Sequence, residues 1–447
     1  MTHGALDFDL IVIGAGMAGI NAAAAAGDIG ARVAVVERDR VGGTCPLRGC
    51  IPSKALVRSA EVAHTLRTAR RFGIGVDSVS VDMPTVAARI NEIIDVGAAG
   101  ALGYLRSFPT VEVVPGEARF TAPGEVSVGA STLRGRRVII ATGNPPTTPD
   151  IPGLAGVPHL HSDDILQLTT VPERLTVIGA GPVGLEMGQA MSRLGSWVTI
   201  IESSPRLLPG AEPEIGDILH ECLTAEGIEI MLSAEILHAE MSPRGLPRLT
   251  VRRQGGTRMI DGNAVLVAAG RTPDIESLAL EKAGVDGGPH GIRVDSRLET
   301  TGSGHFAAGD VLGPPFGSFT HVARRLGLSA AANALDHHPH DVDDDPGPTA
   351  IFTDPEVATV GLTEDDARTA GHAVGVGISD FAGGRGRAWG EERGMVKVVA
   401  DVPSRRILGA HLIAYHGADL IHTAVVAMRA GSADPLIDAP HIHPTFG

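Results

Sequence analysis

Two of the three cysteines in this chain of 447 residues, Cys45 and Cys50, lie only five positions apart. Glycines flank the segment that contains them, and the segment follows a glycine-rich turn of the kind that binds dinucleotides. Two thiols this close can form and open a disulfide, a step that moves two electrons. The pair therefore predicts a redox site in which a disulfide exchanges electrons with a flavin held nearby.

The spacing of the pair requires a local break in helical structure. Disulfide-bonded residues usually have Cα atoms ~4.4–6.8 Å apart, and a regular helix brings residues five apart only to the limit of that range. Pro46 and Gly49 would permit the distortion. Arg48 could favour a thiolate by its charge, although an ordinary surface position is an equally good interpretation. Cys222 has no companion motif and is expected to be a small buried side chain.

A repeated pattern must position this site. It consists of a buried-strand run, a Gly-x-Gly-x-x-Gly turn, a helical segment, a second strand, and a glutamate 18 positions after the last glycine. The first copy has the strand Leu10–Ile13, the glycines Gly14, Gly16 and Gly19, and Glu37; the second has Leu175–Ile178, Gly179, Gly181, Gly184 and Glu202.

One such turn is weak evidence, because glycines cluster in turns by chance. Two copies in strand–turn–helix–strand context predict two Rossmann-type units. The glycines allow the backbone to approach a pyrophosphate, which the helix N-terminus stabilises, and the glutamate accepts hydrogen bonds from a ribose. At Glu202 a carboxylate favours NAD over NADP, since only Arg206 offers a positive charge nearby.

Composition and charge exclude several classes of function. The net charge of -15 argues against nucleic acid or an anionic membrane as a partner. No run of ~18 apolar residues predicts a membrane span, and residues 1–9 lack the features of a signal peptide. So few cysteines predict a reducing, cytoplasmic location, where a close pair is more often catalytic than structural.

Two segments predict domain linkers. Residues 144–149 contain three prolines and predict a rigid, non-helical connection. Residues 337–348 are polar and broken by prolines; their histidines could bind a metal, but a solvated linker is the better interpretation, so no metal site is predicted. Beyond them the chain predicts strands and a helix, with a strand at Met395–Ala400.

The chain resembles the pyridine nucleotide–disulfide oxidoreductases of the glutathione reductase and dihydrolipoyl dehydrogenase group. The resemblance extends almost from end to end and implies two Rossmann-like dinucleotide-binding domains plus an α+β dimerisation domain. It implies an FAD domain at 1–148, an NAD domain at 149–269, a return to the FAD domain at 270–347, and an interface domain at 348–447. The further motifs that carry it are Ile140–Gly143, Ala268–Pro273, Phe306–Val311, Phe352–Ala358 and His443–Thr445.

The resemblance also implies roles for individual residues. Cys50 lies against the flavin and Cys45 exchanges with substrate. Lys54 lies beside the flavin with Glu186 as its ion-pair partner. His443 is the acid–base group and serves the cysteines of the partner subunit, which implies a homodimer.

The cofactor residues follow from the same motifs. Residues 318–321 are expected to start a helix that points at the flavin, with His321 filling space. FAD is expected to contact Gly14, Gly16, Gly19, Glu37, Gly43, Thr44, Lys54, Ala118, Thr142, Gly143, Asp310, Thr320 and His321, and NAD to contact Gly179, Gly181, Gly184, Glu202 and Gly270.

Three departures from the family pattern affect the assignment. The family's glutamate that orients the histidine would follow Gly447, so we expect the sequence to be truncated there. Pro182 occupies the position of a gating residue that is often tyrosine, which predicts an open nicotinamide pocket. Pro46, Leu47 and Arg48 replace the Leu-Asn-Val common in dihydrolipoyl dehydrogenases.

The leading hypothesis is a dihydrolipoyl dehydrogenase-like enzyme that passes electrons from a substrate dithiol, small or carrier-bound, to NAD. Glu202 and His443 favour it over an NADPH-dependent glutathione reductase. A mercuric reductase is less favoured, because no heavy-metal domain precedes residue 10 and no cysteine pair lies near the C-terminus. A transhydrogenase would not need the cysteine pair. A non-catalytic flavin redox sensor stays open, because the histidine lacks its glutamate.

Overall fold

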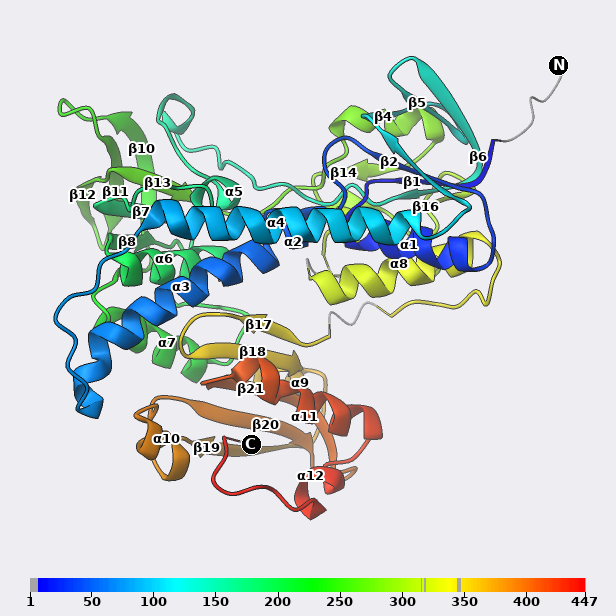
Figure 1. Cartoon of the computed structure of the whole chain (residues 1–447). Helices are drawn as coiled ribbons and strands as arrows, with labels where there is room; N and C mark the ends of the chain where they lie inside the picture. The colour runs from blue at the N-terminus through cyan, green and yellow to red at the C-terminus, as the bar shows by residue number, and fades with distance from the viewer. Residues whose placement is uncertain (1–6, 315, 317–318, 344–346, 447) are drawn as a thin grey trace, which may run out of the picture. The chain divides into compact units, whose positions relative to one another are not determined.

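The protein, described here by a computed structural model that covers residues 7–314, 316, 319–343 and 347–446, is a mixed α/β chain (Figure 1). It folds into two compact units, each assembled from three separate stretches of the sequence. One unit contains Met1–Ala55, Ala87–Thr147 and Arg271–Pro346, and the other contains Leu56–Val86, Thr148–Gly270 and Gly347–Gly447.

A seven-stranded sheet forms the centre of the first unit. Its order is β3-β2-β1-β6-β5-β4, and β16 also pairs with β6. β1, β2, β3, β6 and β16 are parallel, while β4 and β5 continue from β6 as an antiparallel extension. The strands are β1 Phe8–Ile13, β2 Val33–Glu37, β3 Val111–Pro115, β4 Ala118–Ala122, β5 Glu125–Val128, β6 Ser131–Ile140 and β16 His305–Ala307, and a small hairpin joins β14 Gly287–Gly288 to β15 Gly291–Ile292.

The apolar runs explain why these strands are central. Leu10, Ile11 and Val12 are fully buried, as expected for parallel strands covered on both faces. Helices α1 and α8 lie side by side in this unit (Figure 1). They approach closely at Gly327, where a Cβ would lie 2.1 Å from the Ala18 carbonyl oxygen. The helices here are α1 Met17–Asp28, α2 Thr44–Leu47 and α8 Thr320–Ala334, and two helices that extend into both units are α3 Cys50–Thr68 and α4 Met83–Arg106.

The second unit contains a four-stranded parallel sheet of order β13-β7-β8-β9 and a three-stranded antiparallel sheet of order β10-β11-β12. One apolar core, which includes Ile178, Leu249 and Val267, joins them. The elements are β7 Arg174–Ile178, β8 Trp197–Ile201, β9 Glu229–Met231, β10 Glu235–Met241, β11 Pro247–Arg253, β12 Gly256–Asp261, β13 Ala264–Val267, α5 Ser162–Ile165, α6 Pro182–Leu194 and α7 Pro213–Ala225.

The same unit holds a five-stranded antiparallel sheet of order β17-β18-β21-β20-β19. Helix α11 packs on this sheet and buries Ile421 against Leu412 and Ala358. The elements are β17 Thr349–Ile351, β18 Glu356–Gly361, β19 Val374–Asp380, β20 Met395–Asp401, β21 Arg406–Ala414, α9 Glu364–Thr369, α10 Gly384–Trp389, α11 Gly417–Ala430 and α12 Asp434–Asp438.

The structure confirms the predicted strands of both repeats and the strand at Met395–Ala400, which is β20. Residues 144–149 are non-helical, as predicted. Part of the predicted connector, residues 344–346, lies outside the described residues. Among the residues that are described, no helix has the length and apolar character needed to cross a membrane.

Candidate active site

One edge of the seven-stranded sheet gathers the residues predicted to bind FAD. The carboxyl ends of parallel strands meet at this edge, which is where open α/β sheets bind ligands. Gly14 follows β1, Glu37 ends β2, Thr142 lies just beyond β6, and Asp310 lies just beyond β16. The fold therefore brings together residues that are up to nearly 300 positions apart in the sequence.

At this edge, backbone segments approach each other so closely that only glycine, which has no Cβ, fits at several positions. Gly14 has φ +100°, and a Cβ there would lie 2.4 Å from the Ala141 carbonyl oxygen. A Cβ on Gly19 would lie 1.8 Å from the Gly14 oxygen, and one on Gly43, at φ +66°, would lie 2.6 Å from the Gly16 Cα. Because side chains are absent, the start of α1 presents bare backbone to which a phosphate can bind.

The two predicted glutamates make equivalent bonds in the two repeats. Glu37 accepts the N–H groups of Ala15 at 2.7 Å and Asp39 at 2.9 Å. Glu202 accepts those of Ala180 and Ser204, both at 2.8 Å. Burial tends to raise the pKa of Glu202, but the hydrogen bonds from Ser204 and Ala180 outweigh burial and lower it. The Glu202 carboxylate is thus held ionised beside its glycine turn, and both carboxylates have lone pairs left for a ribose.

Two polar groups at the sheet edge fit a bound FAD. Thr142 Oγ1 is buried and has no hydrogen-bond partner within the described chain. Burial raises the pKa of Asp310 to about 6, against the opposing effect of the Arg271 charge. Groups of this kind need a polar partner, and the hydroxyls of a bound FAD would be suitable partners. Gly143 follows Thr142, and Thr44 begins α2. Lys54 is the fifth residue of α3, and Ala118 is buried at the start of β4.

A second set of glycines lies at the carboxyl edge of the four-stranded sheet. Gly179 has φ +100° and would place a Cβ 2.6 Å from the Ala268 oxygen, while a Cβ on Gly184 would lie 2.0 Å from the Gly179 oxygen. Gly181 caps α6, and Gly270 follows β13. Pro182 is the first residue of α6, a position where the missing N–H costs nothing. This edge fits a nicotinamide dinucleotide.

The cysteine pair spans a break between two helices, as predicted. α2 ends at Leu47, Arg48 has a non-helical φ of −143°, and α3 begins at Cys50. Both cysteines are free thiols; Cys45 is half-buried and Cys50 is exposed. The Cys50 Sγ lies 3.2 Å from the Thr320 hydroxyl, at the start of α8.

The two thiols have very different acidities. The hydrogen bond from Cys45, assisted by Thr320 and by the charge of Lys54, lowers the pKa of Cys50 to about 5 against the effect of burial. The hydrogen bond with Cys50, together with burial, raises the pKa of Cys45. At neutral pH the reduced pair is therefore one thiol donating to one thiolate, with the negative charge on Cys50.

We expect the alkylation of Cys50 by iodoacetamide to be nearly independent of pH between about pH 6 and pH 8, because its thiolate is already formed above its lowered pKa. Peptide mapping of the reduced protein measures the rate. Thr320→Val should shift the onset of alkylation to higher pH, because it removes a hydrogen bond to the thiolate, whereas Thr320→Ser should not. A wild-type rate that rises about tenfold per pH unit in that range would contradict a lowered pKa.

The structure also tests what was expected of several other residues. Arg48 pairs with Asp39 and is partly exposed, which supports the surface interpretation. His321 is exposed and stacks on Phe319 with ring centroids 5.7 Å apart, so it does not fill interior space. Cys222 is buried, as predicted. Ser318, which we expected to help start α8, lies outside the described residues.

The two remaining predicted catalytic residues lie in the second unit. Glu186 is buried on α6 and accepts the N–H of Phe352 at 2.9 Å. His443 follows α12 and is exposed, and its ring has no hydrogen-bond partner among the described residues. The described part of the chain holds no cluster of three or more histidine, cysteine or acidic side chains suited to a metal.

Comparisons with known proteins extend over nearly the whole chain. Residues 8–337 match the pyridine nucleotide-disulphide oxidoreductase family, and residues 347–447 match the dimerisation domain of the same family. A mercuric reductase from Bacillus cereus is 36% identical over 96% of this chain and 68% of its own length. A dihydrolipoyl dehydrogenase from Thermus scotoductus is 38% identical over 98% of this chain and 95% of its own length.

A similar solved structure is the HOCl-induced flavoprotein disulfide reductase RclA from Escherichia coli, with a TM-score of 0.87, 28% identity, and coverage of 98% of this chain and 97% of that one. A Cu(II) complex of the same protein is similar with a TM-score of 0.86. The chain belongs to the pyridine nucleotide-disulphide oxidoreductases, flavoprotein enzymes that use FAD and NAD(P)H.

Proposed function

We propose that this chain is an FAD-dependent dithiol–disulfide oxidoreductase of the dihydrolipoyl dehydrogenase type. The observation that carries the proposal is the placement of Cys45 and Cys50 on either side of the break between α2 and α3, with Cys50 Sγ 3.2 Å from the Thr320 hydroxyl. In the reduced state this pair has one thiol and one thiolate. A sensor would need only a reactive cysteine, whereas this asymmetric pair suits repeated exchange with a dithiol.

In the proposed reaction a substrate thiolate attacks Cys45 of the Cys45–Cys50 disulfide. The bond between the two cysteines breaks, a mixed disulfide forms at Cys45, and Cys50 leaves as a thiolate, which its low pKa favours. The second substrate thiol gives its proton to His443 of the partner subunit and attacks the mixed disulfide. The substrate departs as a disulfide, and Cys45 and Cys50 remain reduced. Bound FAD would supply the path for two electrons from the reduced cysteine pair to NAD⁺. The Cys45–Cys50 disulfide then reforms, NAD⁺ becomes NADH, and one proton is released to solvent.

The remaining assignments follow the same proposal. The match to a dimerisation domain supports a homodimer that provides His443 to the opposite cysteine pair. Glu202 supports NAD, because its ionised carboxylate would repel a 2′-phosphate. We keep the division at residues 148, 269 and 347 and the predicted roles of Lys54 and Glu186 as parts of this proposal.

Metal-ion reduction is the second candidate function. Relatives named mercuric reductase match this chain about as well as those named dihydrolipoyl dehydrogenase, and the similar RclA has been solved with Cu(II). Here a soft metal ion would be the substrate, held by the same two sulfurs, and no separate metal site would be needed.

We expect the purified, FAD-loaded protein to form NADH from dihydrolipoamide and NAD⁺ under anaerobic conditions, because the cysteine pair can be reduced by a dithiol. NADH formation is followed by its absorbance, with intact mass confirming the length of the chain. Parallel assays measure NADH oxidation with Hg(II) or Cu(II). Turnover with a metal ion but not with the dithiol would move the assignment to the second candidate, and no turnover with any of them would favour a sensor.

A further inference from the structure

One face of helix α6 carries three buried polar side chains. Glu186, Gln189 and Arg193 are spaced by three and four residues, so they lie along one side of the helix. They are only 6%, 4% and 7% exposed. Buried polar groups need hydrogen-bond partners, and all three find one in the short segment between β17 and β18.

The contacts with this segment are regular. The Phe352 N–H donates to Glu186 Oε1 at 2.9 Å. Two residues further on, the Asp354 N–H donates to Gln189 Oε1 at 2.8 Å, and Gln189 Nε2 donates back to the Asp354 carbonyl oxygen at 2.8 Å. The Asp354 carboxylate pairs with Arg193 at 2.9 Å. The backbone group that holds Glu186 is thus part of a segment fixed at its other end by Gln189 and Arg193.

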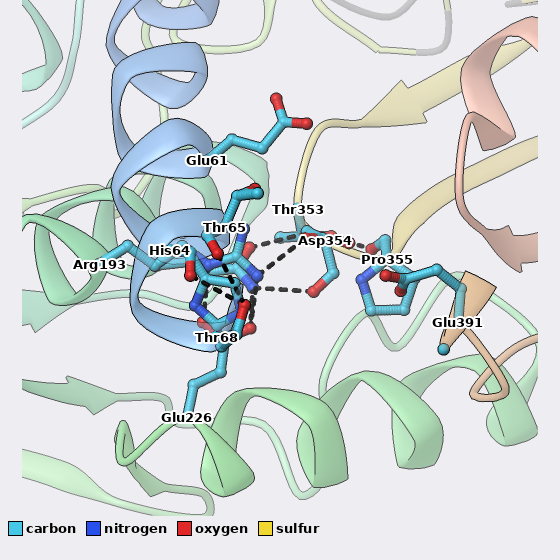
Figure 2. A network of polar contacts seen from close by, with 12 residues as sticks. Glu61, His64, Thr65, Thr68, Arg193, Glu226, Thr353, Asp354, Pro355 and Glu391 are labelled. Carbon is cyan, nitrogen blue, oxygen red and sulfur yellow. Dashed lines mark hydrogen bonds and ion pairs between the residues drawn. The ribbon is translucent and has the colours of Figure 1, made fainter. Parts of the chain in front are cut away.

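Arg193 is itself held from the opposite side. Its guanidinium donates to both carboxylate oxygens of Glu226, at 2.8 Å and 2.6 Å, and so lies between Glu226 and Asp354 (Figure 2). Burial tends to lower the pKa of Arg193, but the two carboxylates outweigh burial and raise it. A bidentate, charge-assisted contact of this kind is strong and directional.

The segment between β17 and β18 borders a cavity on one side. A cavity of about 510 Å³ borders Arg193, Glu226 and Asp354, and the Asp354 side chain is 34% exposed. On that side the segment has no tightly packed neighbours to keep it in place. The pairing of β17 with β18 holds the two ends of the segment. Between those ends, the position of Asp354 depends on its hydrogen bonds with Gln189 and on its ion pair with Arg193.

We infer that Gln189 and Arg193 are positioning residues that act through Glu186, by fixing the segment whose Phe352 N–H orients the Glu186 carboxylate. The inference rests on the proposed function, in which Glu186 is a catalytic carboxylate near the flavin. Loss of either residue frees the segment, and the carboxylate then leaves the geometry that electron transfer from NADH requires.

The test is anaerobic stopped-flow reduction of the FAD-loaded protein by NADH, a half-reaction that needs no dithiol. Arg193→Met and Gln189→Leu should each slow the limiting rate about tenfold, and Arg193→Lys, which keeps the charge, should restore part of it. Asp354→Asn, at a partly exposed side chain, keeps the side-chain size and the backbone bonds with Gln189 and removes only the charge that pairs with Arg193. It should also slow the limiting rate. Glu364→Gln is the matched control: it removes the ion pair between Glu364 and Lys397, which lies in the same unit and does not touch α6, and should leave the rate unchanged.

A double-mutant cycle separates positioning from a general structural role. If Arg193 acts through Glu186, the double variant should reduce its flavin at the same rate as Glu186→Gln alone. If the two substitutions slowed flavin reduction independently, so that their effects multiplied in the double variant, the inference would be overturned. An equal loss of rate in the Glu364→Gln control would overturn it too. If Glu186→Gln slowed flavin reduction by NADH while Arg193→Met reduced the flavin at the wild-type rate, the inference would be overturned and the proposed function would stand. Glu186→Gln behaving as wild type would remove both the catalytic role of Glu186 and the inference.

Discussion

Replacing Cys45 by serine is expected to lower dithiol-dependent NADH formation about a thousandfold or more. Serine cannot form a disulfide with Cys50, so the substrate dithiol has no bond to open. A serine hydroxyl can still donate a hydrogen bond to Cys50, so that thiolate should persist. Reduction of the bound flavin by NADH should therefore continue in the variant, and anaerobic absorbance measurements can follow both reactions in the same sample.

The matched control is Cys222→Ser, since Cys222 is the remaining cysteine and lies buried in the other unit. It should retain turnover with the dithiol, although the buried hydroxyl lowers the free energy of unfolding somewhat. Substantial dithiol turnover in Cys45→Ser would mean that electrons reach the flavin without the cysteine pair, and the proposed reaction would then be wrong.

The second large effect is expected at Gly19, where alanine should give a protein that does not retain FAD and is less stable. The added Cβ would lie 1.8 Å from the Gly14 carbonyl oxygen, so the turn and the start of α1 must separate. Overpacking of this kind lowers the free energy of unfolding by about 1–3 kcal/mol or more. The flavin-to-protein absorbance ratio and a urea unfolding curve measure the two effects.

Gly16→Ala provides the comparison, because its Cβ would meet only the Gly43 Cα at 3.9 Å. This variant should unfold like the wild type and yet bind FAD more weakly, since the fingerprint predicts close approach of the pyrophosphate at that position. If Gly19→Ala purified with a full complement of FAD and unchanged stability, the tight contact between the turn and α1 would not govern cofactor binding.

Much of the fold was predictable because its signals are local. Strand runs such as Leu10–Ile13 are apolar throughout, and the spacing from glycine turn to glutamate is the same in both repeats. The break between the cysteines could also be predicted, from Pro46 and Gly49. These features depend on backbone sterics within one strand–turn–helix unit, which the sequence expresses directly.

Other parts of the site were not predictable because they depend on long-range contacts. The hydroxyl of Thr320 lies against Cys50, 270 positions away in sequence, and no local pattern indicates it. The antiparallel sheet β10–β12 was missed as well. For Gln189 and Arg193 a weak signal did exist, because both recur at helical spacing from Glu186 on a face that the pattern of α6 buries. Their partners, Phe352 and Asp354, could be found only from the structure.

The bond between Glu202 and the Ala180 N–H has a consequence for cofactor engineering. A designer who wished this chain to accept NADP would replace Glu202 with a small apolar or a basic residue to remove the repulsion of a 2′-phosphate. The same change would leave the N–H groups of Ala180 and Ser204 without their acceptor, and part of the loop would have to rearrange. A successful design would therefore need a second substitution that supplies an acceptor there, and single-site libraries at position 202 should yield poorly folded proteins more often than altered specificity.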